Sequence, residues 1–278
     1  MNKQYVNIDG IMKLQDNFVI KSNNRAFKYG DALFETMFSS ANKIPLFNRH
    51  IERLINSMKI LKMEIPDKFT INKDSLFYEI TRLLNKNKLH KGARVRITVY
   101  RTGEGLYTPE NNNISYLIDA SGIENTEYKY NTQGIKIDIF TEILKPQNIF
   151  SNLKTTNTLL YILAGIYKKE ARVDDVLLLN DNYNVIEALS SNIFIVKDNQ
   201  VYTPNLEDGC VNGIMRNHII YIAKKNNISI KYKPLTLEDI ESAEEIFLTN
   251  SISGIKWVGG YLKKRYYNKI SSLLASYL

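Results

Sequence analysis

The chain has 278 residues, of which 44% are hydrophobic and 24% are charged. This composition is typical of a globular protein with a sizeable core, and the length favours two domains. The formal net charge of +8 would attract small anions, but the lysines are scattered and no nucleic-acid motif accompanies them. We therefore expect no nucleic-acid partner, and no membrane span, because no apolar run is long enough for one.

In the first half of the chain, hydrophobic periodicity predicts three strands and one helix. The strands are residues 18–20, 93–100 and 114–120, and the helix is 47–61. The strand at 93–100 alternates, so Arg94, Arg96 and Thr98 share one side. A polar, glycine-bearing stretch follows at 121–131. We interpret it as a linker between a small N-terminal domain, 1–120, and a larger C-terminal domain, 132–278.

The second half again mixes both kinds of element. Strands are predicted at 135–140, 176–179, 184–187, 193–196 and 246–249, and helices at 155–169 and 214–225. In the first of these helices, Leu159, Ile162, Leu163 and Ile166 form the stripe expected to be buried. No regular strand–helix–strand repeat appears, so the prediction is a two-domain protein of mixed α+β and α/β character.

Cysteine and histidine content argues against a metal centre. With one cysteine, Cys210, and three histidines, a zinc cluster of these residues is not expected, and neither is any other metal site. A single cysteine also excludes an internal disulfide and fits a reducing compartment. Because residues 1–5 lack the apolar core of a signal peptide, we expect a cytoplasmic protein.

A lysine and a carboxylate carry the strongest chemical signal. Lys154 lies in a polar turn before a predicted helix, and Glu187 follows about 33 residues later, between two strand-like runs. A lysine in this setting is a candidate Schiff-base amine, and the carboxylate is a candidate partner for a protonated pyridine nitrogen. The pair suggests pyridoxal phosphate, which needs an amine, an acid and an anion site. Taken singly, Lys154 is better explained as a solvated loop lysine, and Glu187 as a carboxylate at the edge of a hairpin.

Other residues could complete such a site. Gly213 precedes a helix whose free N–H groups, at Ile214 and Met215, could bind a phosphate. Arg53 could add a charge-assisted bond, and Ser251 a hydroxyl. Arg94, Arg96 and Arg101 could receive substrate carboxylates, or they could lie on an exposed strand face. Tyr107 and the glycine-bearing loop before it could form a mobile lid, or an ordinary hairpin loop.

Taken in order, six segments of the chain resemble the class IV, or fold-type IV, pyridoxal-phosphate enzymes. This family holds branched-chain aminotransferases, D-amino acid aminotransferases and 4-amino-4-deoxychorismate lyases, and the similarity covers nearly the whole chain. The six segments are Arg25 to Thr36, His50 to Leu54, Lys154, Glu187 to Phe194, Val211 to Arg216, and Thr249 to Ser251.

The resemblance implies two domains with the cofactor between them, and a homodimer in which a loop of one subunit closes the pocket of the other. It implies Lys154 as the catalytic residue. The cofactor contacts that it implies are Arg53, Lys154, Glu187, Ser191, Asn192, Val211, Ile214, Met215, Asn250 and Ser251. The residues expected to contact substrate are Tyr29, Arg94, Arg96, Arg101, Tyr107 and Ile252.

Local sequence favours one branch of that family. The branched-chain enzymes carry Gly-Gly-Asn-Tyr after the lysine, whereas residues 155–158 are Thr-Thr-Asn-Thr. The Arg-x-His substrate trap of the D-amino acid enzymes is absent from residues 104–107. Val211 to Arg216 is similar to the lyase branch, although the arginine frequent in that branch's glycine loop is missing. We therefore expect a 4-amino-4-deoxychorismate lyase, with an aminotransferase for branched-chain or D-amino acids as the alternative. A catalytically silent binding protein is a third possibility, which the intact Lys154 disfavours.

Overall fold

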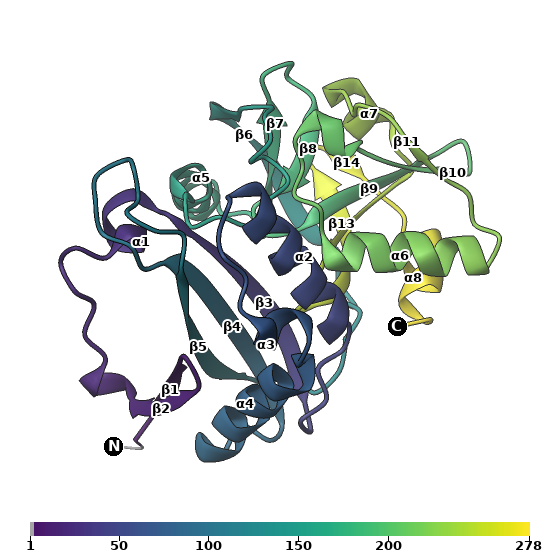
Figure 1. Cartoon of the computed structure of the whole chain (residues 1–278). Coiled ribbons are helices and arrows are strands. Elements are labelled where there is room, and N and C mark those ends of the chain that lie inside the picture. The colour runs from purple at the N-terminus through teal and green to yellow at the C-terminus, as the bar shows by residue number, and fades with distance from the viewer. Residues whose placement is uncertain (1–2) are drawn as a thin grey trace. The chain divides into compact units, whose positions relative to one another are not determined.

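The computed structural model describes residues 3–278, which divide into two compact units (Figure 1). The first unit contains residues up to 127 and a short separate segment, 154–157. The second contains residues 128–153 and 158–278. The division after residue 127 lies inside the stretch predicted as a linker, but the preceding strand runs three residues into that stretch, to Ile123. No helix in the described residues is long and apolar enough to cross a membrane.

The first unit is built on a five-stranded antiparallel sheet in the order β2-β1-β5-β4-β3. Helix α2 packs on β3, and α4 packs on β1 and β5. The strands are β1 (Tyr5–Ile8), β2 (Ile11–Leu14), β3 (Ala32–Ser40), β4 (Gly92–Arg101) and β5 (Ile114–Ile123). The helices are η1 (Gln15–Asn17), α1 (Arg25–Tyr29), α2 (Phe47–Ile60), α3 (Asp67–Thr70) and α4 (Lys73–Lys86).

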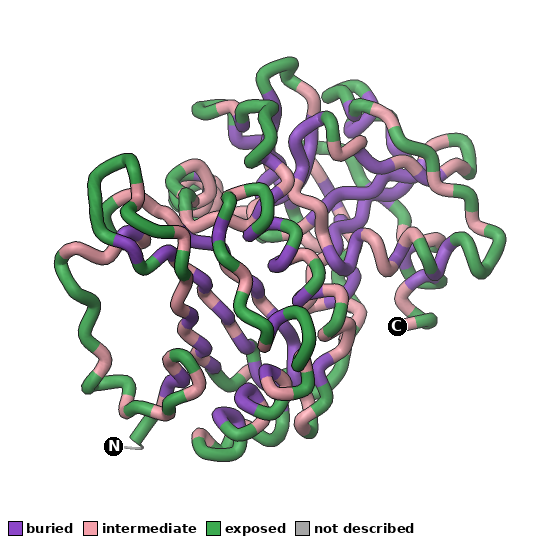
Figure 2. Tube along the Cα trace, in the orientation of Figure 1, coloured by how far each residue is buried: buried purple, intermediate pink, exposed green. Residues whose placement is uncertain are grey.

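Alternation in this sheet follows the sequence pattern. In β4, Val95, Ile97 and Val99 are buried, whereas Arg94 and Arg96 point to the other, less buried face. Figure 2 shows buried and less buried residues alternating along these strands. The predicted strand at 18–20 is wrong: these residues follow η1 without forming a strand, and most of their apolar surface is exposed.

The second unit holds a nine-stranded sheet in the order β11-β10-β9-β12-β13-β6-β7-β8, with β14 paired to β13. A further pairing of β8 with β9 closes six of these strands into a ring. The strands are β6 (Ile135–Lys145), β7 (Asp175–Asn180), β8 (Val185–Ala188), β9 (Asn192–Lys197), β10 (Gln200–Thr203), β11 (Ile230–Tyr232), β12 (Glu245–Asn250), β13 (Gly254–Tyr261) and β14 (Lys264–Arg265). The helices are α5 (Leu159–Glu170), η2 (Leu206–Asp208), α6 (Ile214–Lys225), α7 (Leu237–Ser242) and α8 (Lys269–Ala275).

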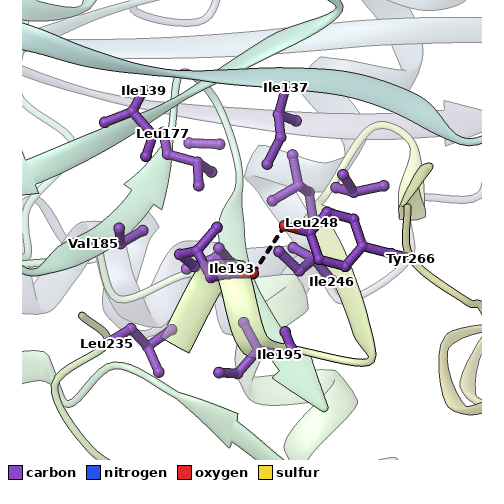
Figure 3. Close-up of a cluster of buried hydrophobic side chains, with 14 of the residues drawn as sticks. Ile137, Ile139, Leu177, Val185, Ile193, Ile195, Leu235, Ile246, Leu248 and Tyr266 are labelled. Atoms are coloured by element: carbon purple, nitrogen blue, oxygen red, sulfur yellow. Dashed lines mark hydrogen bonds between the residues drawn. The ribbon is translucent and has the colours of Figure 1, made fainter. Parts of the chain in front are cut away.

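Alternate residues of the ring strands form a dense apolar cluster that includes Ile137, Leu177, Ile193 and Leu248 (Figure 3). A second cluster, around Phe140, lies under α5. Together these clusters fix the strand ends from which the candidate site residues project.

Helix α5 differs from its prediction in two ways. It begins at Leu159 instead of residue 155, because residues 154–156 pair with the edge of β3. Its predicted buried stripe is also wrong in the single chain, since Leu159, Ile162, Leu163 and Ile166 are between 41% and 76% exposed. The helix is apolar on both sides, and it buries the opposite side, with Leu160, Tyr161, Ala164 and Tyr167 packed on the second cluster.

Candidate active site

Lys154 is held by its backbone at the edge of the first unit's sheet. Its carbonyl accepts a 2.9 Å hydrogen bond from the N–H of Phe34, and the N–H of Thr156 donates to Ala32 on the same strand. The side chain is half-buried, with Nζ 4.4 Å from the centre of the Phe34 ring. The backbone of Lys154 therefore pairs with β3, and its amine lies against the ring of Phe34 on the same strand.

Arg96 reaches the same aromatic ring. Its guanidinium carbon lies 3.7 Å from the centre of the Phe34 ring, which is a close cation–π contact. Its Nε donates to Thr98 Oγ1 at 3.1 Å. Lys154 and Arg96 thus meet at one ring, within about 8 Å of each other if the two ring distances are laid end to end. The structure brings the predicted amine and a predicted carboxylate-binding arginine together.

Arg96 is a half-buried cation, and the nearby carboxylate of Asp119 only partly offsets the effects of burial and of Arg94 on its pKa. Burial lowers the pKa of Arg96, the carboxylate of Asp119 raises it, and the neighbouring Arg94 lowers it again. Asp119 stands opposite Arg96 in the β4–β5 register. Burial raises the pKa of Asp119, while Arg96 and Arg94 lower it. An anionic ligand here would add negative charge beside two arginines and one carboxylate.

Arg101, the third arginine predicted to bind substrate, belongs to the structural core of the first unit. Its guanidinium donates to Asp31 at 3.0 Å, to the carbonyls of Leu61 and Lys62, and to Asn112. Asp31 also pairs with Arg25 at 2.8 Å. Because these partners use the nitrogens of Arg101, we leave it out of the proposed substrate site.

The two predicted substrate tyrosines lie together. The rings of Tyr29 and Tyr107 have centroids 5.6 Å apart, and Tyr107 is exposed. Arg25 ties the loop before Tyr107 to α1, because its Nη1 donates to the carbonyls of Gly105 and Leu106. The predicted lid loop is thus anchored at its base by a buried arginine.

Arg53, predicted as a phosphate ligand, forms an ion pair with a buried glutamate that the sequence did not single out. Its Nε and Nη2 donate to the two oxygens of Glu35 at 2.7 and 2.6 Å, and His50 Nδ1 lies 2.7 Å from the same carboxylate. Burial alone would raise the pKa of Glu35. The charge of Arg53 and the hydrogen bonds from His50 and Arg53 outweigh that effect and lower this pKa to about 2. Two of the three guanidinium nitrogens of Arg53 therefore bind Glu35, and its contact to a phosphate stays a prediction.

In the second unit, Glu187 lies on β8 with its carboxylate buried among donors. Oε1 accepts from Lys145 Nζ at 2.6 Å and from Tyr161 Oη at 2.7 Å, and Oε2 accepts from the N–H of Val211 at 2.8 Å. Sequence reasoning missed both Lys145 and Tyr161. A lysine that ends a strand just before a proline was the only local signal for the former.

The start of α6 is arranged as an anion site would require. Gly213 is its N-cap, and among residues 3–278 no side-chain cap hydrogen bond forms at this helix start, whose first N–H groups include those of Ile214 and Met215. Asn192 donates to the carbonyl of Val211 at 2.8 Å. A Cβ on Gly213 would stand only 1.8 Å from Asn192 Oδ1, so this approach requires glycine. The residues therefore fit a phosphate group, which free N–H groups at a helix N-terminus bind well.

The last predicted cofactor loop is ordered by Asn250. Its Oδ1 accepts from the N–H groups of Ile252 and Ser253 at 3.0 and 2.9 Å, which makes an Asx turn. Its Nδ2 donates to Ser191 Oγ at 3.0 Å. Next to it, the buried hydroxyl of Thr249 has no hydrogen-bond partner among residues 3–278. A buried hydroxyl in that state is suited to a polar ligand.

The amino-acid sequence is similar to a defined protein family. A family model described as amino-transferase class IV matches residues 32–258. A protein of Methanocaldococcus jannaschii, provisionally named branched-chain-amino-acid aminotransferase, is 29% identical over 232 residues, 82% of this chain and 77% of that protein. The aminodeoxychorismate lyase of Vibrio harveyi is 25% identical over 238 residues, 85% of each chain.

The fold has matches among solved structures. The branched-chain aminotransferase of Thermoproteus uzoniensis, solved with norvaline, superposes with a TM-score of 0.87. The match covers 99% of this chain and 93% of that one, at 22% sequence identity. At this identity the likeness establishes the architecture, a small antiparallel sheet and a β-barrel unit, and nothing about substrate.

Proposed function

We propose that this chain, which belongs to the class IV aminotransferase family, is a 4-amino-4-deoxychorismate lyase that forms 4-aminobenzoate and pyruvate. The fold is that of a fold-type IV enzyme, and the cofactor is pyridoxal 5'-phosphate. The observation that carries the lyase proposal is the meeting of Lys154 and Arg96 at the Phe34 ring. A dicarboxylate substrate needs cationic donors beside the reacting amine, and Arg94 adds a second cation on the same strand face.

The residue roles follow from the groups present. Lys154 would hold the cofactor covalently, Glu187 its ring nitrogen, and the start of α6 with Arg53 and Ser251 its phosphate. When bound, the cofactor ring accepts the electron pair released at the amine-bearing carbon of the substrate. Lys154 would remove the proton from that carbon and return a proton to the departing enolpyruvyl group, which leaves as pyruvate. The bond that breaks is the carbon–oxygen bond to that group, and no water is consumed.

The alternative is an aminotransferase for branched-chain or D-amino acids, and it rests on a specific observation. The relative with 29% identity carries a branched-chain aminotransferase name, against 25% for the lyase. The same Lys154 would then carry the proton of the amine-bearing carbon to the cofactor side of the substrate–cofactor link, so that the amino group passes to the cofactor and the substrate leaves as a keto acid. A monocarboxylate would need only one of the two arginines.

Replacing Arg96 by methionine separates the two functions. A charge-assisted bond to a carboxylate is worth about 1.5–3 kcal/mol, so Arg96→Met should lower kcat/KM for aminodeoxychorismate roughly tenfold to a hundredfold. Formation of 4-aminobenzoate and half-transamination of L- and D-amino acids should be measured side by side, with Arg82→Met, an exposed arginine on α4, as the control. Robust leucine turnover in the wild type that ignores Arg96→Met would favour the aminotransferase.

We also propose that the enzyme is a homodimer that buries the outer stripe of α5. A helix that is apolar on all sides is normally buried on all sides, yet Leu159, Ile162, Leu163 and Ile166 are exposed in the single chain. In a symmetric homodimer the same apolar stripe is present on both subunits, so the two stripes can pack against each other. The family resemblance also implies this assembly.

A charge in the stripe should break the assembly. Ile162→Glu is expected to convert a dimer into a 32.1 kDa monomer in light scattering coupled to size exclusion, because a carboxylate buried in an apolar interface has no partner. Arg82→Glu, at an exposed position of α4, should leave the mass unchanged. A wild-type monomer at micromolar concentration would rule the interface out.

A further inference from the structure

Lys145 is a second buried lysine, distinct from the one assigned to catalysis. It ends β6, and its ammonium lies 2.6 Å from Glu187 Oε1, with the two side chains 9% and 4% exposed. The same ammonium donates to the carbonyl of Ser151 at 2.9 Å and lies 5.7 Å from the centre of the Tyr161 ring. Both partners accept hydrogen bonds from the Lys145 amine, so this buried group is paired.

We infer that Lys145 is a positioning residue, which holds Glu187 as a fixed carboxylate with Oε2 as the oxygen left for the cofactor's ring nitrogen. This inference deepens the proposed function and rests on its assignment of Glu187. It also separates the two lysines by role. The amine of Lys145 is bound to Glu187 and to the carbonyl of Ser151, whereas the amine of Lys154 lies against the Phe34 ring.

The two carboxylate oxygens of Glu187 have different hydrogen-bond partners, and this difference supports the inference. Oε1 accepts two hydrogen bonds, from Lys145 and Tyr161, which come from β6 and α5. Oε2 accepts one, from the N–H of Val211. A carboxylate has about four acceptor positions, so Oε2 retains one for a further donor. The N–H of a protonated pyridine is such a donor, and the two partners of Oε1 prevent the carboxylate from rotating away.

Lys145 is the one cation among the side chains that hydrogen-bond to Glu187 in the described chain. Tyr161 is neutral, because burial first and then the charge of Glu187 raise the pKa of its phenol far above its usual range. Cys210, which also faces Glu187, is a neutral thiol, since burial raises its pKa to about 12. Without Lys145 no charged side chain of the described residues would donate a hydrogen bond to the Glu187 carboxyl group, and burial favours the protonated form of a carboxyl group.

The test uses the holoenzyme with Lys145→Met, Lys145→Gln and Lys145→Arg. In the methionine and glutamine variants we expect cofactor still bound at Lys154, shown by borohydride reduction and peptide mass. Turnover should fall at least about tenfold, as for loss of a hydrogen bond to a charged group. The acid-side decline of kcat should also move to higher pH, because a buried carboxyl group that loses a charged partner is more easily protonated. Lys145→Arg, which keeps the charge, should restore the wild-type pH profile.

The outcomes distinguish this inference from the proposed function. Cofactor bound at Lys154 with an unchanged pH profile in Lys145→Met or Lys145→Gln would overturn the positioning role alone. Cofactor bound at Lys145 in the wild type would overturn both assignments. If Lys145→Met does not fold, Lys145→Gln decides, because glutamine keeps a donor and removes only the charge. A purely structural role would lower stability and leave the pH profile where it is.

Discussion

Lys154→Ala is expected to abolish measurable turnover and the visible absorbance of the lysine-bound cofactor. General acid–base catalysis by one side chain contributes about 10²–10⁴-fold, and here the same amine would also hold the cofactor covalently. The loss should therefore be at least of that size. The alanine variant keeps the backbone hydrogen bonds between residues 154–156 and β3 and loses only the contact of the amine with the Phe34 ring reported above, so it should melt within a few degrees of the wild type.

A variant of an exposed lysine and peptide mapping of the labelled lysine provide the controls for the Lys154→Ala result. Lys169→Ala, at an exposed position of α5, should behave as the wild type in activity and absorbance. Borohydride reduction of the wild-type holoenzyme followed by peptide mapping should place the phosphopyridoxyl group on the peptide containing Lys154. A label on Lys145 in Lys154→Ala would show that the second lysine can attack the cofactor, which its ion pair with Glu187 argues against.

Local sequence patterns were sufficient to predict those elements whose hydrophobic pattern is compatible with only one buried face. The alternation in β4 predicted which residues face which side, and in α2 the apolar residues Ile51 and Leu54, spaced to share one helix face, are buried. Helix α6 has the predicted bounds, because a glycine precedes it and its apolar period is clear. These features depend on contacts within a few residues.

The errors occurred where a distant part of the chain decides the outcome. In α5 two stripes are equally apolar, so periodicity could not tell which one packs on the unit's own core. Residues 155 and 156 were predicted as helix, yet they pair with β3, more than a hundred residues earlier in the chain. A strand was expected at 18–20, where an apolar run exists but no neighbouring strand pairs with it in the described residues.

The same distinction applies to the candidate site. Motif residues such as Lys154 and Glu187 could be selected from their neighbours in sequence. Their partners could not, because Glu35 binds Arg53 from another element, and Lys145 reaches Glu187 from 42 residues away. Pairs of opposite charge are common in any sequence, and only folding shows which of them are buried together.

Glu187→Gln is expected to lower kcat by at least about 10²–10³-fold, the usual cost of removing one preorganised electrostatic contact to developing charge. An amide cannot balance the charge of a ring nitrogen. It also creates a conflict at either oxygen position, because its NH₂ group would face Lys145 and Tyr161 on one side or the N–H of Val211 on the other. Cofactor should still be bound at Lys154, as shown by borohydride reduction and peptide mass.

The effect of Glu187→Gln on the free energy of unfolding must be measured separately from its effect on turnover. Breaking a buried ion pair by removing one partner costs about 3–5 kcal/mol, because Lys145 would be left as a buried charge without its carboxylate. The double variant Glu187→Gln with Lys145→Met removes that charge, so its melting temperature should recover most of the loss. Its turnover should not recover, because the ring nitrogen still lacks a carboxylate. Wild-type turnover in either variant would mean that Glu187 serves only the internal ion pair, and that another group faces the cofactor ring.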